Sequence, residues 1–461
     1  MKHAARLIAA ALSWSLLLGL TACTDPKPTP EEPAISAIEA YNTAKAQLLA
    51  APNRLLNYTI TNTYTTGGQS YTESTTGTAS YSDFGTDNMV AIIDEDLLYG
   101  SVSAEYLLSF CNGQSYSRIS GSIFGAALTA ADFVAEQLPA VLMDPVLYGS
   151  ITRTVNADGS VIHFSQPNAL ENWVDVPKNT IIMINNIAAS AILDKDGVLV
   201  QSNYNVDYTC GNLSFSLKVT VKCSTPAKLE LSTIHPEHPD DYAELSCMAA
   251  PKLLLRAAGN ILSSGSIEAD TTETIYSQII PLTRQRQSQI SLSGRGQTLA
   301  ATLINTTTVK DYRDQPEITT QVYDFFQGVC SLTVNDGTPS VQPDITASGM
   351  RTSLEDSLLS ALFAIRYLAG ATITEQENCY RLDLTGNESY CSDLTRDLSS
   401  FLNLSLDGAT SHKNTSAGGY LCIDKLTGLP VEMGMYFSRT HIIGDIPYVL
   451  SYQLDQAIDF P

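Results

Sequence analysis

The sequence predicts an α+β fold with two tandem half-barrel domains, each a curved antiparallel sheet covered by helices. The same hairpin pattern appears in Ala191–Thr209 and Cys422–Thr440: an apolar strand, an Asp-Lys turn with glycine, and a second apolar strand. The chain has 461 residues, which is long for one domain and natural for two. A repeated hairpin in a chain of this length indicates a tandem duplication.

The N-terminal residues 1–22 have the pattern of an export signal. Lys2 and Arg6 precede an apolar run from Leu7 to Leu20, which is too short for a comfortable membrane span. The sequence Leu-Thr-Ala before Cys23 resembles the bacterial lipobox, so we expect Cys23 to be lipidated; the alternative is an ordinary signal peptide with a chance cysteine. Residues 23–34 carry alternating prolines and predict an extended tether.

The first repeat begins with a predicted helix, Ile35–Ala51, followed by alternating strands. The segment Glu105–Gly121 predicts a hairpin, because its Asn-Gly pair suits a turn that needs two positive φ angles. A second helix is expected over Leu128–Met143, and the hairpin Ala191–Thr209 comes later.

The second repeat has the same order. Helices are predicted over Pro251–Ser264 and Thr352–Leu368, the latter opening with a Thr352 and Glu355 capping box. A strand pair, Thr320–Gly337, lies between them. The predicted domains are therefore residues 35–235 and 251–461, joined by a linker at 236–250, and each is expected to fold by itself.

Composition excludes some classes of partner. The chain has 48 acidic and 26 basic residues, with a formal net charge of −22. A nucleic-acid footprint needs clustered Lys and Arg, so we expect no nucleic-acid partner. Anionic lipid surfaces would repel the chain, so we expect membrane attachment only through the lipid anchor, outside the cytoplasm.

No catalytic motif stands out, so neither an enzyme nor a cofactor is predicted. The best metal-like group is His235, Glu237, His238, Asp240 and Asp241, but interspersed prolines favour a solvated acidic linker. The Asp194–Gly197 segment is better explained as a β-turn than as a calcium loop, because the ligand at position twelve is missing. The eight cysteines after Cys23 leave disulfides open.

Together, the lipobox, the N-terminal helix, the Tyr-rich strands, the Asn-Gly hairpin, the covering helix and the late Asp-Lys-Gly hairpin resemble the LolA/LolB/LppX-type lipoprotein-carrier superfamily. The chain is most similar to the Gram-positive lipoproteins of that type. The motifs are structural rather than catalytic. This resemblance implies open half-barrels with helices as a lid. Several members of the superfamily carry acyl chains or lipids.

A curved sheet incompletely closed by helices leaves a concave apolar face, the usual setting for a hydrophobic ligand. We therefore expect a hydrophobic small molecule or lipid as the partner. The candidate lining residues are inward-facing strand and lid-helix positions: Tyr58, Ile60, Tyr64, Tyr106, Leu108, Phe110, Tyr204, Phe326, Leu358, Leu362 and Met435. The alternative is a structural or protein-interaction lipoprotein of the envelope, in which these residues fill the barrels. A large cavity would favour the first hypothesis and a packed core the second.

Overall fold

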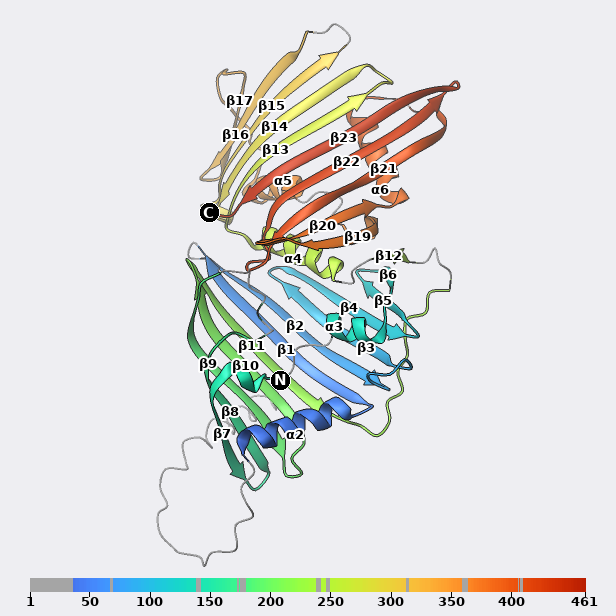
Figure 1. Cartoon of the computed structure of the whole chain (residues 1–461). Helices are drawn as coiled ribbons and strands as arrows, with labels where there is room; N and C mark the ends of the chain where they lie inside the picture. Colours follow the sequence, from blue (N-terminus) through green and yellow to red (C-terminus); the bar gives the residue numbers. More distant parts are fainter. Residues whose placement is uncertain are drawn as a thin grey trace, which may run out of the picture.

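A computed structural model describes residues 36–66, 69–137, 142–171, 174, 180–237, 242–245, 249–311, 315–358, 364–404, 406 and 409–461. The predicted export signal, Cys23, the tether and Leu362 lie outside these residues. Two curved sheets stand one above the other, and one helix lies between them (Figure 1). Among the described residues, no helix is long and apolar enough to span a membrane.

The first lobe contains a 12-stranded sheet in the order β12-β6-β5-β4-β3-β2-β1-β11-β10-β9-β8-β7. Its elements are α2 (Ala37–Ala50), β1 (Arg54–Thr66), β2 (Gln69–Ser82), β3 (Val90–Tyr99), β4 (Val102–Cys111), β5 (Gln114–Ile119), β6 (Ser122–Ala127), α3 (Ala130–Gln137), η1 (Pro145–Leu147), β7 (Tyr148–Asn156), β8 (Gly159–Pro167), β9 (Ile182–Asp194), β10 (Leu199–Cys210), β11 (Leu213–Ser224) and β12 (Ala243–Glu244).

The second lobe contains an 11-stranded sheet in the order β18-β17-β16-β15-β14-β13-β23-β22-β21-β20-β19. Its elements are α4 (Ala250–Ser263), β13 (Ser266–Ser277), β14 (Leu282–Ser293), η3 (Gly296–Thr298), β15 (Ala300–Asp311), β16 (Glu317–Phe326), β17 (Val329–Val334), β18 (Ser340–Val341), α5 (Ala347–Leu358), η5 (Ile365–Tyr367), β19 (Leu368–Glu375), β20 (Cys379–Gly386), α6 (Glu388–Phe401), β21 (Ala409–Asp424), β22 (Pro430–Ile443) and β23 (Ile446–Asp459).

The two sheets share one topology. In each, the first strand pairs with the last long strand, β1 with β11 and β13 with β23, and the other antiparallel strands follow in chain order on both sides. The short β12 is the exception, because it pairs in parallel with β6 at the edge of the first sheet. No described strand joins the two ends of either sheet, so both remain open. This repeated order confirms the predicted duplication, and strands dominate the fold more than an α+β description suggests.

The repeated hairpin is β9–β10 in the first lobe and β21–β22 in the second. In each turn an aspartate holds the backbone. The Asp194 Oδ1 accepts from two backbone N–H groups, and the Asp424 Oδ1 accepts from the backbone N–H and the hydroxyl of Thr427. Glycine supplies the positive φ that follows, 79° at Gly197 and 66° at Gly428. The β-turn interpretation of Asp194–Gly197 is confirmed.

The tight turn between β4 and β5 is also as predicted. Asn112 and Gly113 both have positive φ, 51° and 75°. The matching turn in the second lobe uses Gln327 and Gly328, at 51° and 81°. The duplicated fold therefore preserves the backbone conformation of this turn although one residue type has changed.

The helix predicted over Thr352–Leu368 needs correction at both of its ends. The described part of α5 begins at Ala347 and ends at Leu358, whereas Leu368 opens β19. Thr352 is consequently inside the helix, and the side chain of Thr346 accepts from the backbone N–H of Gly349 at its start. The 3-10 turn at Ile365–Tyr367 leads directly into the sheet, which is why a helical apolar spacing continues past the helix.

Helix α6 was missed and has no described counterpart in the first lobe. Asn387 caps it by accepting from the backbone N–H of Tyr390 at 3.0 Å. Tyr390 and Leu398 are buried one above the other on one face. An Asn before an i, i+4, i+8 apolar pattern was present in the sequence and was enough to find this helix.

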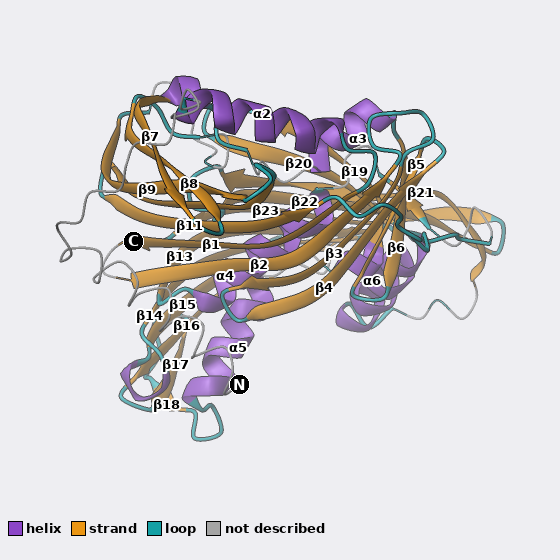
Figure 2. Cartoon of the chain, turned by 90° about the horizontal axis from the view of Figure 1, so that it is seen from below, coloured by secondary structure: helices purple, strands orange, loops and turns teal. Residues whose placement is uncertain are grey.

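The helices lie on the concave faces, and these faces open on opposite sides of the molecule. Seen from below, α2 and α3 lie on one side of the strands, whereas α5 and α6 lie on the other (Figure 2). Phe133 of α3 packs on Phe110 of β4 with ring centroids 4.7 Å apart, and Tyr41 of α2 packs on Phe164 of β8 at 5.0 Å. Buried tyrosine and phenylalanine rings therefore fill much of the first concave face.

Helix α4 is shared by both lobes. Ala250, Leu254 and Ala257 belong to a core that contains the first sheet's inner residues and extends into the second lobe. Ile261, near the other end of the helix, belongs to a second core under α5. The helix that begins the second repeat thus covers part of the first repeat's sheet, which the predicted boundary at residues 236–250 does not anticipate.

Candidate functional site

A cavity of about 790 Å³ lies between the second sheet and its covering helices, and we call it the lobe-2 cavity. Its size is typical of sites for small molecules. The floor comes from β13–β16, β22 and β23, and the cover from α5, the loop before it and α6. The lining residues are Thr271, Glu273, Arg286, Ser288, Ile290, Leu303, Asn305, Gln321, Tyr323, Asp344, Ile345, Gly349, Met350, Ser353, Asp356, Leu394, Met435, Tyr452 and Leu454.

Strand register arranges the cavity floor in rows of different polarity. Ile290, Leu303 and Tyr323 lie side by side across β14, β15 and β16 and make an apolar row. Two residues further along β14, Ser288 donates to the Asn305 amide oxygen at 2.7 Å in a row of uncharged polar side chains. The cavity therefore has an apolar end and a hydrogen-bonding middle, as an amphipathic ligand would require.

The next row carries charge. Arg286 and Glu273 are directly paired on β14 and β13, with an ion-pair distance of 2.9 Å. Arg284 lies two residues from Arg286 on β14, and its guanidinium carbon is 4.1 Å from the centre of the Phe401 ring of α6. Burial is the main cause of the lowered pKa of Arg284, and the nearby Arg286 charge adds to it. The exposed carboxylates of Asp344 and Asp356 lie at the cavity mouth.

A second cavity, of about 560 Å³, lies between the lobes, and we call it the interlobe cavity. Its walls come from β1–β3 and β10–β11 of the first sheet, from α4, and from β19–β20 and the β21–β22 turn of the second lobe. The lining residues are Ile60, Asn62, Glu73, Ser74, Thr75, Tyr99, Val174, Tyr208, Leu217, Ala249, Lys252, Leu253, Arg256, Ile373, Tyr380, Lys425 and Leu426.

Two acidic side chains on the first concave face bind α4. Arg256 donates through Nε to Glu73 at 2.6 Å, and the Asn260 amide donates to the same carboxylate oxygen at 3.3 Å. Both partners of the ion pair are largely buried, with 17% and 10% of their side chains exposed. Burial lowers the pKa of Arg256, but the charge and hydrogen bond of Glu73 outweigh it, and the net pKa is raised.

The second acidic group is Glu95 on β3. It forms an ion pair with Lys252 of α4 and accepts a 2.5 Å hydrogen bond from the Tyr58 hydroxyl. The Lys252 ammonium also lies 4.2 Å from the centre of the Tyr106 ring. Burial, followed by the Glu95 charge, raises the pKa of Tyr58, so this hydroxyl is a hydrogen-bond donor at neutral pH.

The β21–β22 turn of the second lobe docks on α4. The Asn260 amide donates to the carbonyls of Thr427 and Gly428, each at 3.2 Å. Lys425, with 3% of its side chain exposed, forms a 2.6 Å ion pair with the exposed Glu375. The corresponding turn of the first lobe, Asp194–Gly197, has no such partner among the described residues and its Lys195 is exposed. The duplicated hairpins are therefore alike in backbone but different in role.

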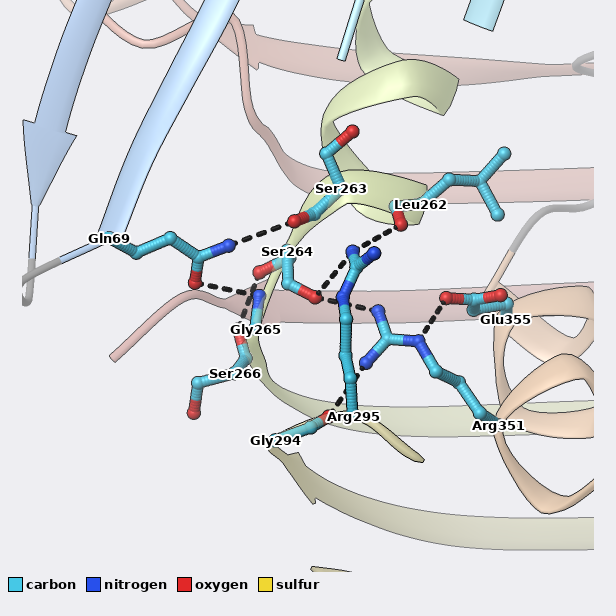
Figure 3. Close-up of polar contacts among 10 residues, drawn as sticks. All are labelled: Gln69, Leu262, Ser263, Ser264, Gly265, Ser266, Gly294, Arg295, Arg351 and Glu355. Carbon is cyan, nitrogen blue, oxygen red and sulfur yellow. Dashed lines mark hydrogen bonds and ion pairs between the residues drawn. The ribbon is translucent and has the colours of Figure 1, made fainter. Parts of the chain in front are cut away.

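The C-terminal end of α4 is held from both lobes (Figure 3). The Gln69 side chain of β2 donates to the Ser263 carbonyl at 2.8 Å and accepts from the Gly265 N–H at 2.7 Å. From the second lobe, Arg295 donates to the Leu262 carbonyl and Arg351 of α5 to the Ser264 carbonyl, both at 2.6 Å. Cations suit the negative end of the helix dipole, so α4 is fixed between α5 and the first sheet.

The predicted lining residues separate into three groups. Tyr58, Tyr64, Tyr106, Leu108, Phe110, Tyr204 and Leu358 face inward and are buried in the cores. Ile60 lines the interlobe cavity and Met435 lines the lobe-2 cavity. Tyr58 and Ile60 share a face with Tyr64, as the alternation predicts.

The orientation predicted for Phe326 is wrong. Its side chain is 64% exposed on the outer face of β16, whereas the neighbouring Phe325 is 2% exposed and points inward. With two aromatic residues in succession, alternation alone does not determine which one is inside. Leu362 lies outside the described residues, so its predicted role stays a prediction.

Sequence reasoning missed the charged residues of the interlobe cavity. Glu73 follows Tyr71 on the inner face of β2, and Glu95 lies between inward Ile93 and Leu97 on β3. A carboxylate at an inward position of an alternating strand needs a buried partner, and this signal was available. The identity of the partner was not, because α4 is about 160 residues or more away in sequence.

The other predicted chemistry is mostly untested. His235 hydrogen-bonds Thr233 at 2.5 Å, and the remaining members of its cluster beyond Glu237 lie outside the described residues. Within the described ranges, no three His, Cys, Asp or Glu side chains gather as a metal site requires. The seven cysteines in those ranges are free thiols.

The chain is only loosely similar to known proteins. No protein-family model and no curated protein matches it. A Pseudomonas aeruginosa MucA/MucB complex structure is 12% identical, covers 62% of this chain and 92% of its own, and has a TM-score of 0.18. A DUF1329 family protein from Desulfovibrio piger is 13% identical, with coverages of 46% and 92% and a TM-score of 0.16.

A third similar structure is a putative AttH from Nitrosomonas europaea. It is 10% identical, the alignment covers 95% of this chain and 99% of that chain, and the TM-score is 0.13. Superpositions this poor carry no argument about function. We therefore infer the function from the cavities and their side chains.

Proposed function

We propose that the protein is a lipid-anchored, extracytoplasmic binding protein that holds a hydrophobic ligand, a lipid or an acyl chain, in the lobe-2 cavity. The observation that carries this proposal is the cavity of about 790 Å³ on the concave face of the second sheet. Apolar side chains from the sheet, α5 and α6 would surround the chain of the ligand, and the row containing Ser288 and Asn305 would orient its polar end.

The function is binding rather than catalysis in this proposal. The charged groups at the cavity floor, Arg286 and Glu273, are bound to each other at 2.9 Å. The first concave face plays a structural part, because α2, α3 and α4 pack on its aromatic residues. In this proposal the second lobe carries the ligand, and the first lobe is a filled, structural half-barrel.

Ligand binding is tested by filling the cavity. Leu303→Trp places an indole in the lobe-2 cavity without removing an apolar group, and we expect it to abolish binding of an environment-sensitive acyl probe. The control is Leu98→Trp on the exposed side of β3, which should leave probe binding unchanged. If the unaltered protein binds no probe and co-purifies with no lipid, the second lobe is a structural module and the proposal is wrong.

The anchor has a separate test. Cys23→Ala removes the thiol that would be lipidated, and no described helix could span a membrane in its place. We expect the variant to move from the membrane fraction to the soluble fraction. Retention in membranes after a salt wash would contradict the anchor but not the cavity.

A further inference from the structure

We propose that the interlobe cavity is a second binding site, distinct from the lobe-2 cavity, for a single-chain amphiphile with a monoanionic head such as a carboxylate. Lys252, Arg256 and Lys425 line this cavity, and among the described lining residues Glu73 is the one carboxylate. Such a concentration of positive charge is unusual in a chain with 26 basic and 48 acidic residues. It makes the cavity selective for negative charge.

The three cations retain donors for a ligand. Arg256 uses Nε for Glu73, which leaves its two terminal nitrogens. Lys252 and Lys425 each use one of three ammonium protons, for Glu95 and Glu375 respectively. The side chains of Arg256 and Lys425 are largely withdrawn from water, where a hydrogen bond to an anion is strongest. The ion pairs hold the cations in place rather than cancelling their capacity to bind.

The start of α4 supports the same sign of charge. Ala249, the N-cap residue, lines the cavity and offers no capping side chain. The first turn of this 14-residue helix contains no acidic residue, so no side chain of the helix itself neutralises its positive end. Backbone N–H groups at a helix start add to the attraction that the three cations exert on an anion.

The rest of the cavity is suited to an apolar chain. Ile60 and Leu217 come from the first sheet, Leu253 from α4, and Ile373 and Leu426 from the second lobe. A volume of about 560 Å³ is sufficient for a small amphiphile. Since these walls belong to both lobes, a bound molecule would stabilise their contact by mass action.

Calorimetry with dodecanoate, below its micelle concentration, tests the proposal. The same measurement with dodecyltrimethylammonium keeps the chain and reverses the charge of the head. We expect dodecanoate to bind and the cation to bind at least tenfold more weakly, roughly the effect of one charge-assisted hydrogen bond. Equal affinities, or no binding of dodecanoate, would overturn the site.

The variant Lys425→Met tests whether dodecanoate binds in the interlobe cavity. The Glu375 side chain is 63% exposed, so the fold should hold, and dodecanoate affinity should fall by about tenfold or more. Glu375→Gln is the matched control, which frees the Lys425 ammonium and should preserve or tighten binding. Leu303→Trp, which fills the lobe-2 cavity, should leave this binding unchanged. If Lys425→Met left dodecanoate affinity unchanged, or if Leu303→Trp abolished it, dodecanoate would bind in the lobe-2 cavity. Either result would refute the interlobe site but not the proposed function of the lobe-2 cavity.

Discussion

Arg256 of α4 and Glu73 of β2 form a 2.6 Å ion pair that joins the two halves of a duplicated chain. The two residues are 183 positions apart in sequence. With Lys252 and Glu95, they make α4 a cover for a sheet that belongs to the other repeat. The halves therefore share a core, and their interface contains charges that each half would otherwise leave unpaired.

Removing one partner of this pair should destabilise the protein strongly. Arg256→Met leaves the Glu73 carboxylate in a site where only 10% of its side chain is exposed. We expect the free energy of unfolding to fall by roughly 3–5 kcal/mol, because a buried charge has lost its partner. The double variant Arg256→Met with Glu73→Gln should recover part of this loss, measured in urea as a double-mutant cycle.

The exposed pair of Lys228 and Glu230 is the matched control. Their side chains are 78% and 81% exposed, so Lys228→Met should change stability very little. A strictly additive cycle for Arg256 and Glu73 would show that the two residues do not interact as described.

Helix α4 should stabilise the first lobe even without the second sheet. The test uses two fragments. Residues 36–249 include β12 but lack α4, and residues 36–266 include both. The longer fragment buries Leu254 and pairs Glu73 and Glu95, so we expect it to be more stable by on the order of 2 kcal/mol or more. Equal urea midpoints for the two fragments would instead support the independent halves expected from sequence.

Gly259 of α4 should be required for packing rather than for the helix. A Cβ added there would come within 2.1 Å of the Tyr99 carbonyl oxygen, which is backbone and has little room to move. Gly259→Ala should raise the helicity of an isolated α4 peptide, since alanine is favoured by about 1 kcal/mol in helices. In the whole protein it should lower the melting temperature, because α4 must move away from β3. A higher melting temperature would contradict the close contact.

His441 should make the second lobe less stable in mild acid. It is 5% exposed, and burial, then the Arg439 and His412 charges, lower its pKa below the usual value of 6.5. The unfolded chain therefore binds this proton first as the pH falls. The stability contribution is full above pH 6.5 and is lost as the pH falls from there through the lowered pKa.

His441→Gln removes this titration, so unfolding free energy should depend less on pH between 7 and 5 than in the unaltered protein. Urea denaturation at several pH values measures the difference. His163→Gln, at an exposed position on β8, should follow the unaltered curve. Parallel curves for all three proteins would rule out His441 as a source of acid sensitivity.

The sequence determined the repeated unit and much of its local structure. The Asp-Lys-Gly turns, the Asn112-Gly113 turn and the alternation of Tyr58, Ile60 and Tyr64 all depend on interactions between near neighbours. Such features follow from backbone sterics and the two-residue period of a strand, which operate wherever the segment lies. Duplication of the whole unit then fixed the order of strands in both sheets.

Tertiary structure alone decided where the cavities are. Periodicity shows that Ile60 and Tyr64 face inward, but the first is at a cavity wall and the second is buried under other side chains. That difference depends on α4 and the turn at Lys425, which come from the other repeat. Local patterns specify a side chain's face, whereas long-range packing specifies what covers it. The partners of Glu73 and Glu95 are of this second kind, because burial forces a charge to be paired without specifying the segment that pairs it.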